Sequence, residues 1–135
     1  MKIGVTSQNF KTITGHAGKT RRFLVFSRDP EGRIVEIDRL DLPKTMSMHE
    51  FQGANHPIDD FGALITGGCG NGFRRRMMSR GVRVIETSET DPEKAAKAVF
   101  SDTPLPEAKP HSHSSAEAKV QLGIQKAGVP GLRDT

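Results

Sequence analysis

Residues 63–72 read ALITGGCGNG, and this stretch decides the fold of the chain. Its apolar first half predicts a buried strand over residues 63–66 that runs into a glycine-rich loop. Residues 73–80 predict a helix, because two apolar residues four positions apart share one face and arginines occupy the rest. Residues 83–86 predict the next strand. A strand–helix–strand unit of this kind makes its two strands parallel and its connection right-handed.

Three further strands are expected in the N-terminal part of the chain. Residues 2–7 and 22–27 predict two of them, and residues 33–40 return as a third after the Asp-Pro-Glu-Gly turn at 29–32. A second helix is expected to begin at Asp91, which is a good N-cap residue and is followed by proline. We therefore expect an α/β fold with a five-stranded mixed sheet, in which an antiparallel meander is followed by a βαβα arrangement.

The composition of the chain changes at residue 101, where prolines and short polar residues begin to accumulate. We expect one α/β domain over residues 1–100 and a flexible linker or tail over 101–135. Within that tail, residues 116–127 have the pattern of one short helix that either docks on the domain or on a partner, or stays disordered. In the middle of the domain, residues 46–52 predict another short helix.

The length and composition exclude several classes of protein. A chain of 135 residues has room for one domain plus a tail, and its single cysteine cannot form an internal disulfide. The absence of Trp and Tyr argues against a base-stacking surface, so nucleic-acid binding is not expected. No apolar run approaches the ~20 residues that span a bilayer, and the N-terminus has the pattern of a strand rather than of a signal peptide. We expect a cytoplasmic protein that makes no membrane contact.

The net charge of +4 arises from cationic residues that gather in two clusters. A modest excess of this kind suits a small anionic ligand or an acidic partner, although cations that only confer solubility have the same composition. The clusters consist of Lys19, Arg21 and Arg22, and of Arg74, Arg75, Arg76, Arg80 and Arg83.

The glycine-rich loop at 67–72 predicts an anion site. Its glycines let backbone N–H groups turn toward a ligand, and the following helix adds positive potential at its N-terminus; a tight strand–helix turn is the alternative. The loop is not a dinucleotide fingerprint, because Phe73 stands where Gly or Ala is required. The Gly18-Lys19-Thr20 sequence is not a P-loop either, since Ile13 replaces the first glycine of that motif.

Four residues are candidate metal ligands. Cys69 lies in the glycine loop, where the helix N-terminus is expected to favour its thiolate; a small buried apolar residue is the alternative. His16 lies in an exposed turn between glycines, at the end of another strand. His49 and His56 belong to a middle segment that also contains two methionines.

The chain contains no pattern of catalytic residues. Asp59 and Asp60 are adjacent, so in an extended segment their carboxylates point in opposite directions and make a poor acid–base pair. No His lies near Cys69 in the sequence, and no Ser, His and Asp stand in an order that suggests a triad. We therefore expect a binding protein rather than an enzyme.

Several stretches together resemble one known family. They are residues 1–6, 16–18, 22–27, 65–72, 81–84 and 89–96. These stretches resemble the dinitrogenase iron–molybdenum cofactor biosynthesis domain, a family that includes the NifX and NafY carriers and the C-terminal domain of NifB. The resemblance covers about residues 1–100. It implies a ribonuclease-H-like fold, and it implies that the protein binds iron–sulfur cofactor precursors or the finished cofactor.

The family motifs match this chain at its two loops, with two departures. Where the family has His-Phe-Gly, the chain has His16-Ala17-Gly18, so the aromatic residue is missing. The Gly-Gly-x-Gly-x-Gly loop of the family matches at 67–72, with Cys69 at a variable position. The middle segment has fewer histidines than many members have.

The resulting hypothesis is a non-catalytic carrier of an iron–sulfur cofactor of the iron–molybdenum type, or of its precursor. Its partners are nitrogenase assembly proteins that donate or accept this cargo. Alternatives are a small-anion or nucleic-acid binding module on the same fold, or a protein-interaction module. The residues expected to contact the cofactor are His16, Gly18, Gly67, Gly68, Cys69, Gly70, Gly72, Arg22 and Arg74, and the metal ligands are sought among His16, Cys69, His49 and His56.

Overall fold

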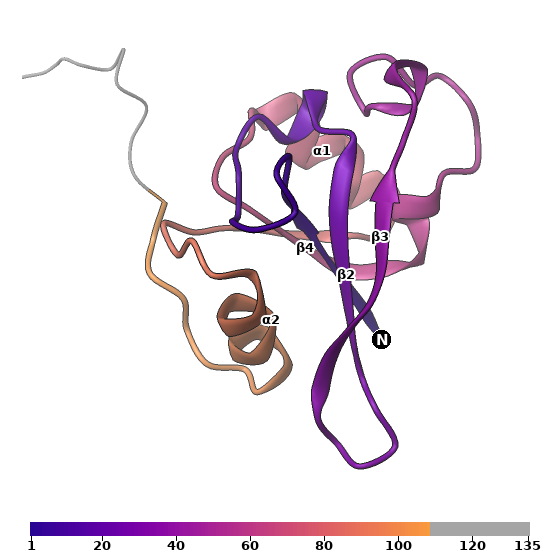
Figure 1. Cartoon of the computed structure of the whole chain (residues 1–135). Coiled ribbons are helices and arrows are strands. Elements are labelled where there is room, and N and C mark those ends of the chain that lie inside the picture. Colours follow the sequence, from indigo (N-terminus) through magenta and orange to yellow (C-terminus); the bar gives the residue numbers. More distant parts are fainter. Residues whose placement is uncertain (109–135) are drawn as a thin grey trace, which may run out of the picture.

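The computed structural model describes residues 1–108, which form a five-stranded sheet flanked by helices (Figure 1). The proposed helix at 116–127 lies outside the described residues. The strands are β1 (Lys2–Thr6), β2 (Arg22–Arg28), β3 (Ile34–Asp41), β4 (Phe61–Thr66) and β5 (Arg83–Glu86), and the helices are α1 (Asn71–Ser79) and α2 (Pro92–Phe100).

The sheet has the strand order β3-β2-β1-β4-β5. Strands β1, β2 and β3 pair antiparallel, whereas β4 pairs parallel with both β1 and β5. The expected meander followed by a parallel crossover is therefore confirmed, as are the mixed sheet and the two helices. Strands β1 and β4 are far apart in the sequence, but because they pair parallel, their carboxyl ends lie at the same edge of the sheet.

The two faces of the sheet carry separate apolar clusters, because successive side chains along a strand point to opposite faces. On one face, Phe73 and Met77 of α1 pack with Leu64 of β4. On the other face, Ala95 and Ala96 of α2 pack with strand residues that include Ile3, Val5, Leu24, Phe26 and Ile65. The helices thus cover opposite faces of one sheet.

Gly4 is a packing requirement that the sequence pattern does not reveal. It lies in the middle of β1, and a Cβ atom at this position would lie 2.2 Å from the ring of Phe61. Any larger residue forces the ring to move. The ring in turn packs into the α1-side core, beside Phe23 at a centroid distance of 6.3 Å.

The helix predicted for residues 46–52 is wrong. The segment contains only a 3-10 turn at Lys44–Met46, followed by hydrogen-bonded turns. Its local hydrogen bonds make isolated turns, such as the one from the N–H of Phe51 to the carbonyl of Ser47. Other groups of the segment bond to distant parts of the chain: the N–H of His49 donates to the carbonyl of Gly18, and Arg76 donates to two carbonyls of the segment. These outside partners replace the hydrogen bonds that a helix needs.

Ordered contacts continue past residue 100, where the sequence placed the boundary of the domain. Leu105 packs against the apolar cluster on the α2 side. The carbonyl of Pro106 accepts hydrogen bonds from the hydroxyl of Thr87 at 2.6 Å and from the N–H of Ser88 at 3.3 Å. Residues 101–108 therefore lie along the domain beside the segment that follows β5.

Candidate functional site

The candidate site lies beyond the carboxyl ends of β1 and β4, the parallel pair at the centre of the sheet. Loops that follow adjacent parallel strands meet at one edge, which is where open α/β sheets usually bind their ligands. Here the loop after β1 contains His16, and the loop after β4 is the glycine-rich stretch. The structure thus brings together two motifs that are fifty residues apart in the sequence.

Backbone hydrogen bonds join the two loops directly. The N–H of Gly67 donates to the carbonyl of Thr14 at 3.0 Å, and the N–H of Ala17 donates to the carbonyl of Gly68 at 3.2 Å. A Cβ atom at Gly67 would lie 3.4 Å from the carbonyl group of Thr14, an ordinary contact distance, so this approach does not itself require glycine. The site is therefore built on two loops that are tied together by their main chains.

Two buried threonines support the loops from beneath. Thr6 ends β1 and Thr66 ends β4, and their hydroxyl oxygens lie 2.9 Å apart. The Thr6 hydroxyl lies 2.6 Å from the carbonyl oxygen of Thr14, and the Thr66 hydroxyl lies 3.2 Å from that of Gly68. Sequence analysis did not single out these threonines, because only the pairing of β1 with β4 places them side by side.

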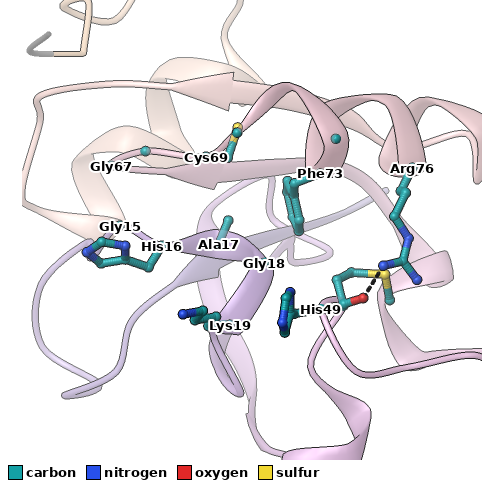
Figure 2. Close-up of a pocket in the computed structure, with 14 residues that line it drawn as sticks. Gly15, His16, Ala17, Gly18, Lys19, His49, Gly67, Cys69, Phe73 and Arg76 are labelled. Atoms are coloured by element: carbon teal, nitrogen blue, oxygen red, sulfur yellow. Dashed lines mark hydrogen bonds between the residues drawn. The ribbon is translucent and has the colours of Figure 1, made fainter. Parts of the chain in front are cut away.

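A pocket of about 650 Å³ opens between the loops, helix α1 and the middle segment (Figure 2). Figure 2 shows Phe73 between the loop of His16 and the start of α1, with His49 opposite. We call this cavity the glycine-lined pocket. Its lining residues are Gly15, His16, Ala17, Gly18, Lys19, Met48, His49, Gly67, Gly68, Cys69, Gly70, Gly72, Phe73 and Arg76.

His16 lies at the rim of the glycine-lined pocket in an unusual backbone conformation. Its φ of 53° and ψ of 48° belong to the left-handed region, which histidine enters more readily than most residues. The side chain is exposed and, within residues 1–108, makes no hydrogen bond through either ring nitrogen. Its imidazole is therefore available to a ligand.

Cys69 also lines the pocket, but its electrostatic environment differs from the expected one. Burial raises the pKa of the Cys69 thiol, and the carboxylate of Glu86 raises it further, while Arg74 opposes this effect. The same carboxylate accepts a hydrogen bond from the N–H of Cys69 at 3.1 Å. Burial and Glu86 thus outweigh the expected effect of the helix N-terminus, and the pKa of this thiol is raised rather than lowered.

Arg74 and Arg22 lie outside the glycine-lined pocket, and each has other partners. Arg74 pairs with Glu86 and donates to the carbonyl of Val84. Arg22 pairs with Asp41, its partner at the first position of the β2–β3 ladder, and donates to the carbonyl of Gln8. The cations that do line the pocket are Lys19 and Arg76.

Arg76 fixes one wall of the pocket through the carbonyls of the middle segment. Its guanidinium donates to the carbonyl of Met48, as Figure 2 shows, and to that of Phe51 at 2.9 Å. One helical turn later, Arg80 donates to the carbonyls of Gly53 and Ala54. Two arginines that the sequence assigned to a cationic surface thus hold a loop in place. Their spacing of four residues, which places them on one side of the helix and its C-cap, is the signal that could have indicated this shared role.

His49 and His56 occupy different positions, although the sequence places them in one segment. His49 is exposed and lines the glycine-lined pocket. His56 is buried away from it, and both of its ring nitrogens are engaged: Nδ1 accepts from the N–H of Ile58 at 3.0 Å, and Nε2 lies 2.6 Å from the carbonyl oxygen of Met46. The structure therefore brings His16, His49 and Cys69 to the pocket and leaves His56 outside it.

The arrangement offers few ligands and an open mouth. Among residues 1–108, no three His, Cys, Asp or Glu residues lie close enough together to form a metal-binding group. Nor does this part of the chain contain a helix long and apolar enough to cross a membrane. The N–H groups of Gly67, Gly68 and Cys69, which the sequence predicted to face a ligand, are bonded within the protein. The site can hold a ligand by the N-terminus of α1, by one or two soft side chains and by the cation of Lys19.

Comparison with solved structures shows the same fold in two proteins of low sequence identity. The crystal structure of PH0822 is 16% identical, with a TM-score of 0.59 over 76% of this chain and 93% of that one. The NMR structure of a putative NifB protein from Thermotoga, described as belonging to the DUF35 family, is 13% identical, with a TM-score of 0.52 over 82% of this chain and 97% of that one. None of the curated proteins compared with the chain matches it.

Comparison with protein families gives the assignment. Residues 1–102 match the sequence model of the family described as dinitrogenase iron-molybdenum cofactor. The match spans both loops of the site and every strand and helix of the described fold. The protein with this glycine-lined pocket is thus a member of the dinitrogenase iron-molybdenum cofactor family.

Proposed function

We propose that the protein carries an anionic iron–sulfur cofactor of the iron–molybdenum type, or its precursor, in the glycine-lined pocket and performs no chemistry on it. The observation that carries this proposal is the free imidazole of His16 at the rim of that pocket. His16 lies in the loop that resembles the family's His-Phe-Gly motif, and membership of the family points to the biosynthesis of the nitrogenase cofactor.

The pocket suits a sulfide-rich anion for three physical reasons. Helix α1 begins at the edge of the cavity with Gly70 as N-cap, so the positive end of the helix faces the ligand. Lys19 adds a full positive charge. Phe73 supplies an aromatic wall to the pocket. It lines the same cavity as Ala17, the residue that stands where the family motif has an aromatic side chain.

His16 is the proposed first ligand, and Cys69 and His49 are proposed as further ligands. The raised pKa of Cys69 does not prevent ligation, because a coordinating metal displaces the thiol proton. Binding through Cys69 therefore releases a proton. A site with so few ligands holds its cargo loosely enough to pass it to an acceptor.

The proposed partners are nitrogenase assembly proteins that donate or accept this cargo. The proposal includes the ribonuclease-H-like classification that the resemblance implies; the order β3-β2-β1-β4-β5, with its antiparallel and parallel halves, supports it. A nucleic-acid or protein-interaction module is not favoured by membership of the family.

The test is an anaerobic titration of the full chain with an isolated iron–sulfur cofactor precursor. Visible absorption that co-elutes with the protein on gel filtration measures the loading. We expect stoichiometric loading of the wild type and a loss of loading in His16→Gly. Glycine is the informative substitution because it adopts the left-handed backbone of His16 without strain and removes only the imidazole.

The matched control is Lys11→Ala, an exposed residue of the same loop that does not line the pocket. This variant should load as the wild type does. Full loading of His16→Gly would remove His16 from the site. Absence of loading in the wild type would overturn the carrier proposal itself.

A further inference from the structure

A second pocket, of about 480 Å³, adjoins the glycine-lined pocket. It is lined by Lys19, Arg21, Lys44, Ser47, His49 and Glu50. Lys19 and His49 line both cavities, so the two pockets share a wall. We call the second cavity the cationic pocket. The function proposed above makes no use of it beyond these two shared residues.

The charges of the cationic pocket are unbalanced. Lys19, Arg21 and Lys44 line it together with a single carboxylate, that of Glu50. None of the ion pairs formed within residues 1–108 involves these four side chains. By contrast, Arg22 and Arg74 are both paired with carboxylates. Cations brought together without a partner repel each other, and a bound anion removes that repulsion.

Ser47 gives an independent indication of a ligand. Ser47 lines the cationic pocket although it is only 4% exposed, and its hydroxyl makes no hydrogen bond to any of residues 1–108. Its backbone, by contrast, is fully used: the N–H donates to Lys44, and the carbonyl accepts from Glu50 and Phe51. A buried hydroxyl without a partner is costly, so a ligand oxygen at this position would satisfy it.

The main chain fixes the positions of the cations. The N–H of Leu42 donates to the carbonyl of Arg21 at 2.9 Å, which holds the segment before the 3-10 turn at Lys44–Met46 against the end of the His16 loop. The N–H of His49 donates to the carbonyl of Gly18 at 2.7 Å, next to Lys19. The cationic side chains therefore start from backbone positions that are set before any ligand binds.

We propose that the cationic pocket binds a multiply charged oxyanion, either phosphate or a small dicarboxylate. Three cations against one carboxylate leave an excess that matches a dianion, and the Ser47 hydroxyl offers one further hydrogen bond to it. A planar guanidinium at Arg21 suits either oxyanion, because both present two oxygens side by side. This ligand is distinct from the metal-containing cargo and occupies a different cavity.

The test uses the full chain and calorimetric titration with inorganic phosphate and, separately, with malonate, at constant ionic strength. We expect saturable binding at one site for at least one of the two. Arg21→Gln and Lys44→Gln should each weaken this binding roughly tenfold, as expected for one charge-assisted hydrogen bond. Ser47→Ala should weaken it less, and Glu50→Gln should strengthen it, because the only opposing charge is removed.

Lys2→Gln and Lys11→Gln are the control variants, since each removes an exposed cation that lines neither pocket. Equal urea midpoints show that the folds are intact. Binding of phosphate alone or malonate alone supports the proposal and identifies the ligand class. Absence of saturable binding of both, or equal weakening in the control variants, overturns it.

The outcome does not depend on the carrier proposal. Arg21, Lys44 and Ser47 line only the cationic pocket, so the cluster loading of their variants should equal that of the wild type. A wild-type protein that binds oxyanion but does not load cofactor overturns the carrier proposal alone. One that loads cofactor but binds neither oxyanion overturns the oxyanion proposal alone.

Discussion

At the scale of single residues, neighbouring charge decides the chemistry of Cys69. The residue lies one position before the N-cap of α1, where the helix alone would favour a thiolate. Burial and the carboxylate of Glu86 outweigh that effect and raise the pKa of the thiol. Glu86 is itself held in place by Arg74. Burial thus raises the pKa of the thiol most, and a carboxylate seventeen positions away in the sequence raises it further.

Replacement of Glu86 by Gln should make Cys69 more reactive. Removing the carboxylate lowers the thiol pKa, so at any pH below that pKa a larger fraction is thiolate. Because a less basic thiolate is also a weaker nucleophile, the alkylation rate should rise only roughly threefold for each pKa unit lost. Iodoacetamide labelling followed across pH by mass spectrometry measures this. Asp38→Asn, on the exposed face of β3, should label as the wild type does, and an unchanged profile in Glu86→Gln would refute the role of Glu86.

At the scale of elements, the short 3-10 helix at Pro57–Asp60 depends on its N-cap, His56. The Nδ1 atom of His56 caps the helix by accepting the N–H of Ile58, while the carboxylate of Asp59 accepts the N–H of His56. The ring also packs edge-on against Phe51, with centroids 4.7 Å apart. The cap itself requires an imidazole whose Nδ1 is unprotonated, since only then can that atom accept the N–H of Ile58. The cap explains why a histidine that resembled a metal ligand is a structural residue.

The stability of the protein should fall below about pH 6.5 because of this histidine. Burial, with a smaller contribution from Arg80, lowers the pKa of His56 below its ordinary value of 6.5. The unfolded chain therefore takes up this proton first, and stability is lost as the pH falls from the unfolded pKa toward the folded one. Urea unfolding at several pH values measures the slope. His56→Asn, which still caps the helix but does not titrate, should lose the part of the slope that His56 contributes; an identical slope would assign the effect to other groups.

For some elements, the local sequence was sufficient to predict the secondary structure. The sequence predicted the strands around 63–66 and 83–86 and helix α1, because the spacing of their apolar residues matches the period of a strand or of a helix. It did not predict the middle segment, because the conformation of that segment depends on Arg76 and on the carbonyl of Gly18, which lie far away in the sequence. Met48 in that segment is a core residue, so the pattern that suggested a helix reflects tertiary packing.

At the scale of the whole molecule, the described fold includes the stretch after α2. Leu105 covers the α2 side of the sheet, and Pro106 bonds to the segment that follows β5. That segment also contains Thr90, whose carbonyl accepts the N–H of Ile13 in the loop of the candidate site. Residues 101–108 thus contribute to a chain of contacts that reaches the loop containing His16.

A chain that ends at residue 100 should be less stable than one that ends at residue 108. The shorter chain lacks the packing of Leu105 and two hydrogen bonds to Pro106, which together amount to about 2 kcal/mol. Urea denaturation of the two chains measures the difference. Leu105→Ala in the longer chain should reproduce part of the loss, and equal midpoints for the two chains would show that these contacts add nothing.

The sequence revealed the backbone of the candidate site better than its side chains. His16 and the loop at 67–72 carry short motifs, so they were recognised without any knowledge of the fold. Lys19, Phe73 and Arg76 became pocket residues only through the docking of α1 and the middle segment against the loops. Arg22 and Arg74 were predicted to contact the cofactor because of their charge. Strand pairing and helix packing instead bring each of them to a carboxylate, which the sequence alone does not show.

The main-chain bonds between the two loops of the site have a consequence for its dynamics. Loop amides usually exchange their protons with solvent quickly, whereas those of Ala17 and Gly67 are bonded across the site as they would be in a sheet. Both should be protected from deuterium exchange in the empty protein. Little conformational entropy then remains to be lost when a ligand arrives, so the rate of capture is set by encounter rather than by rearrangement of the backbone.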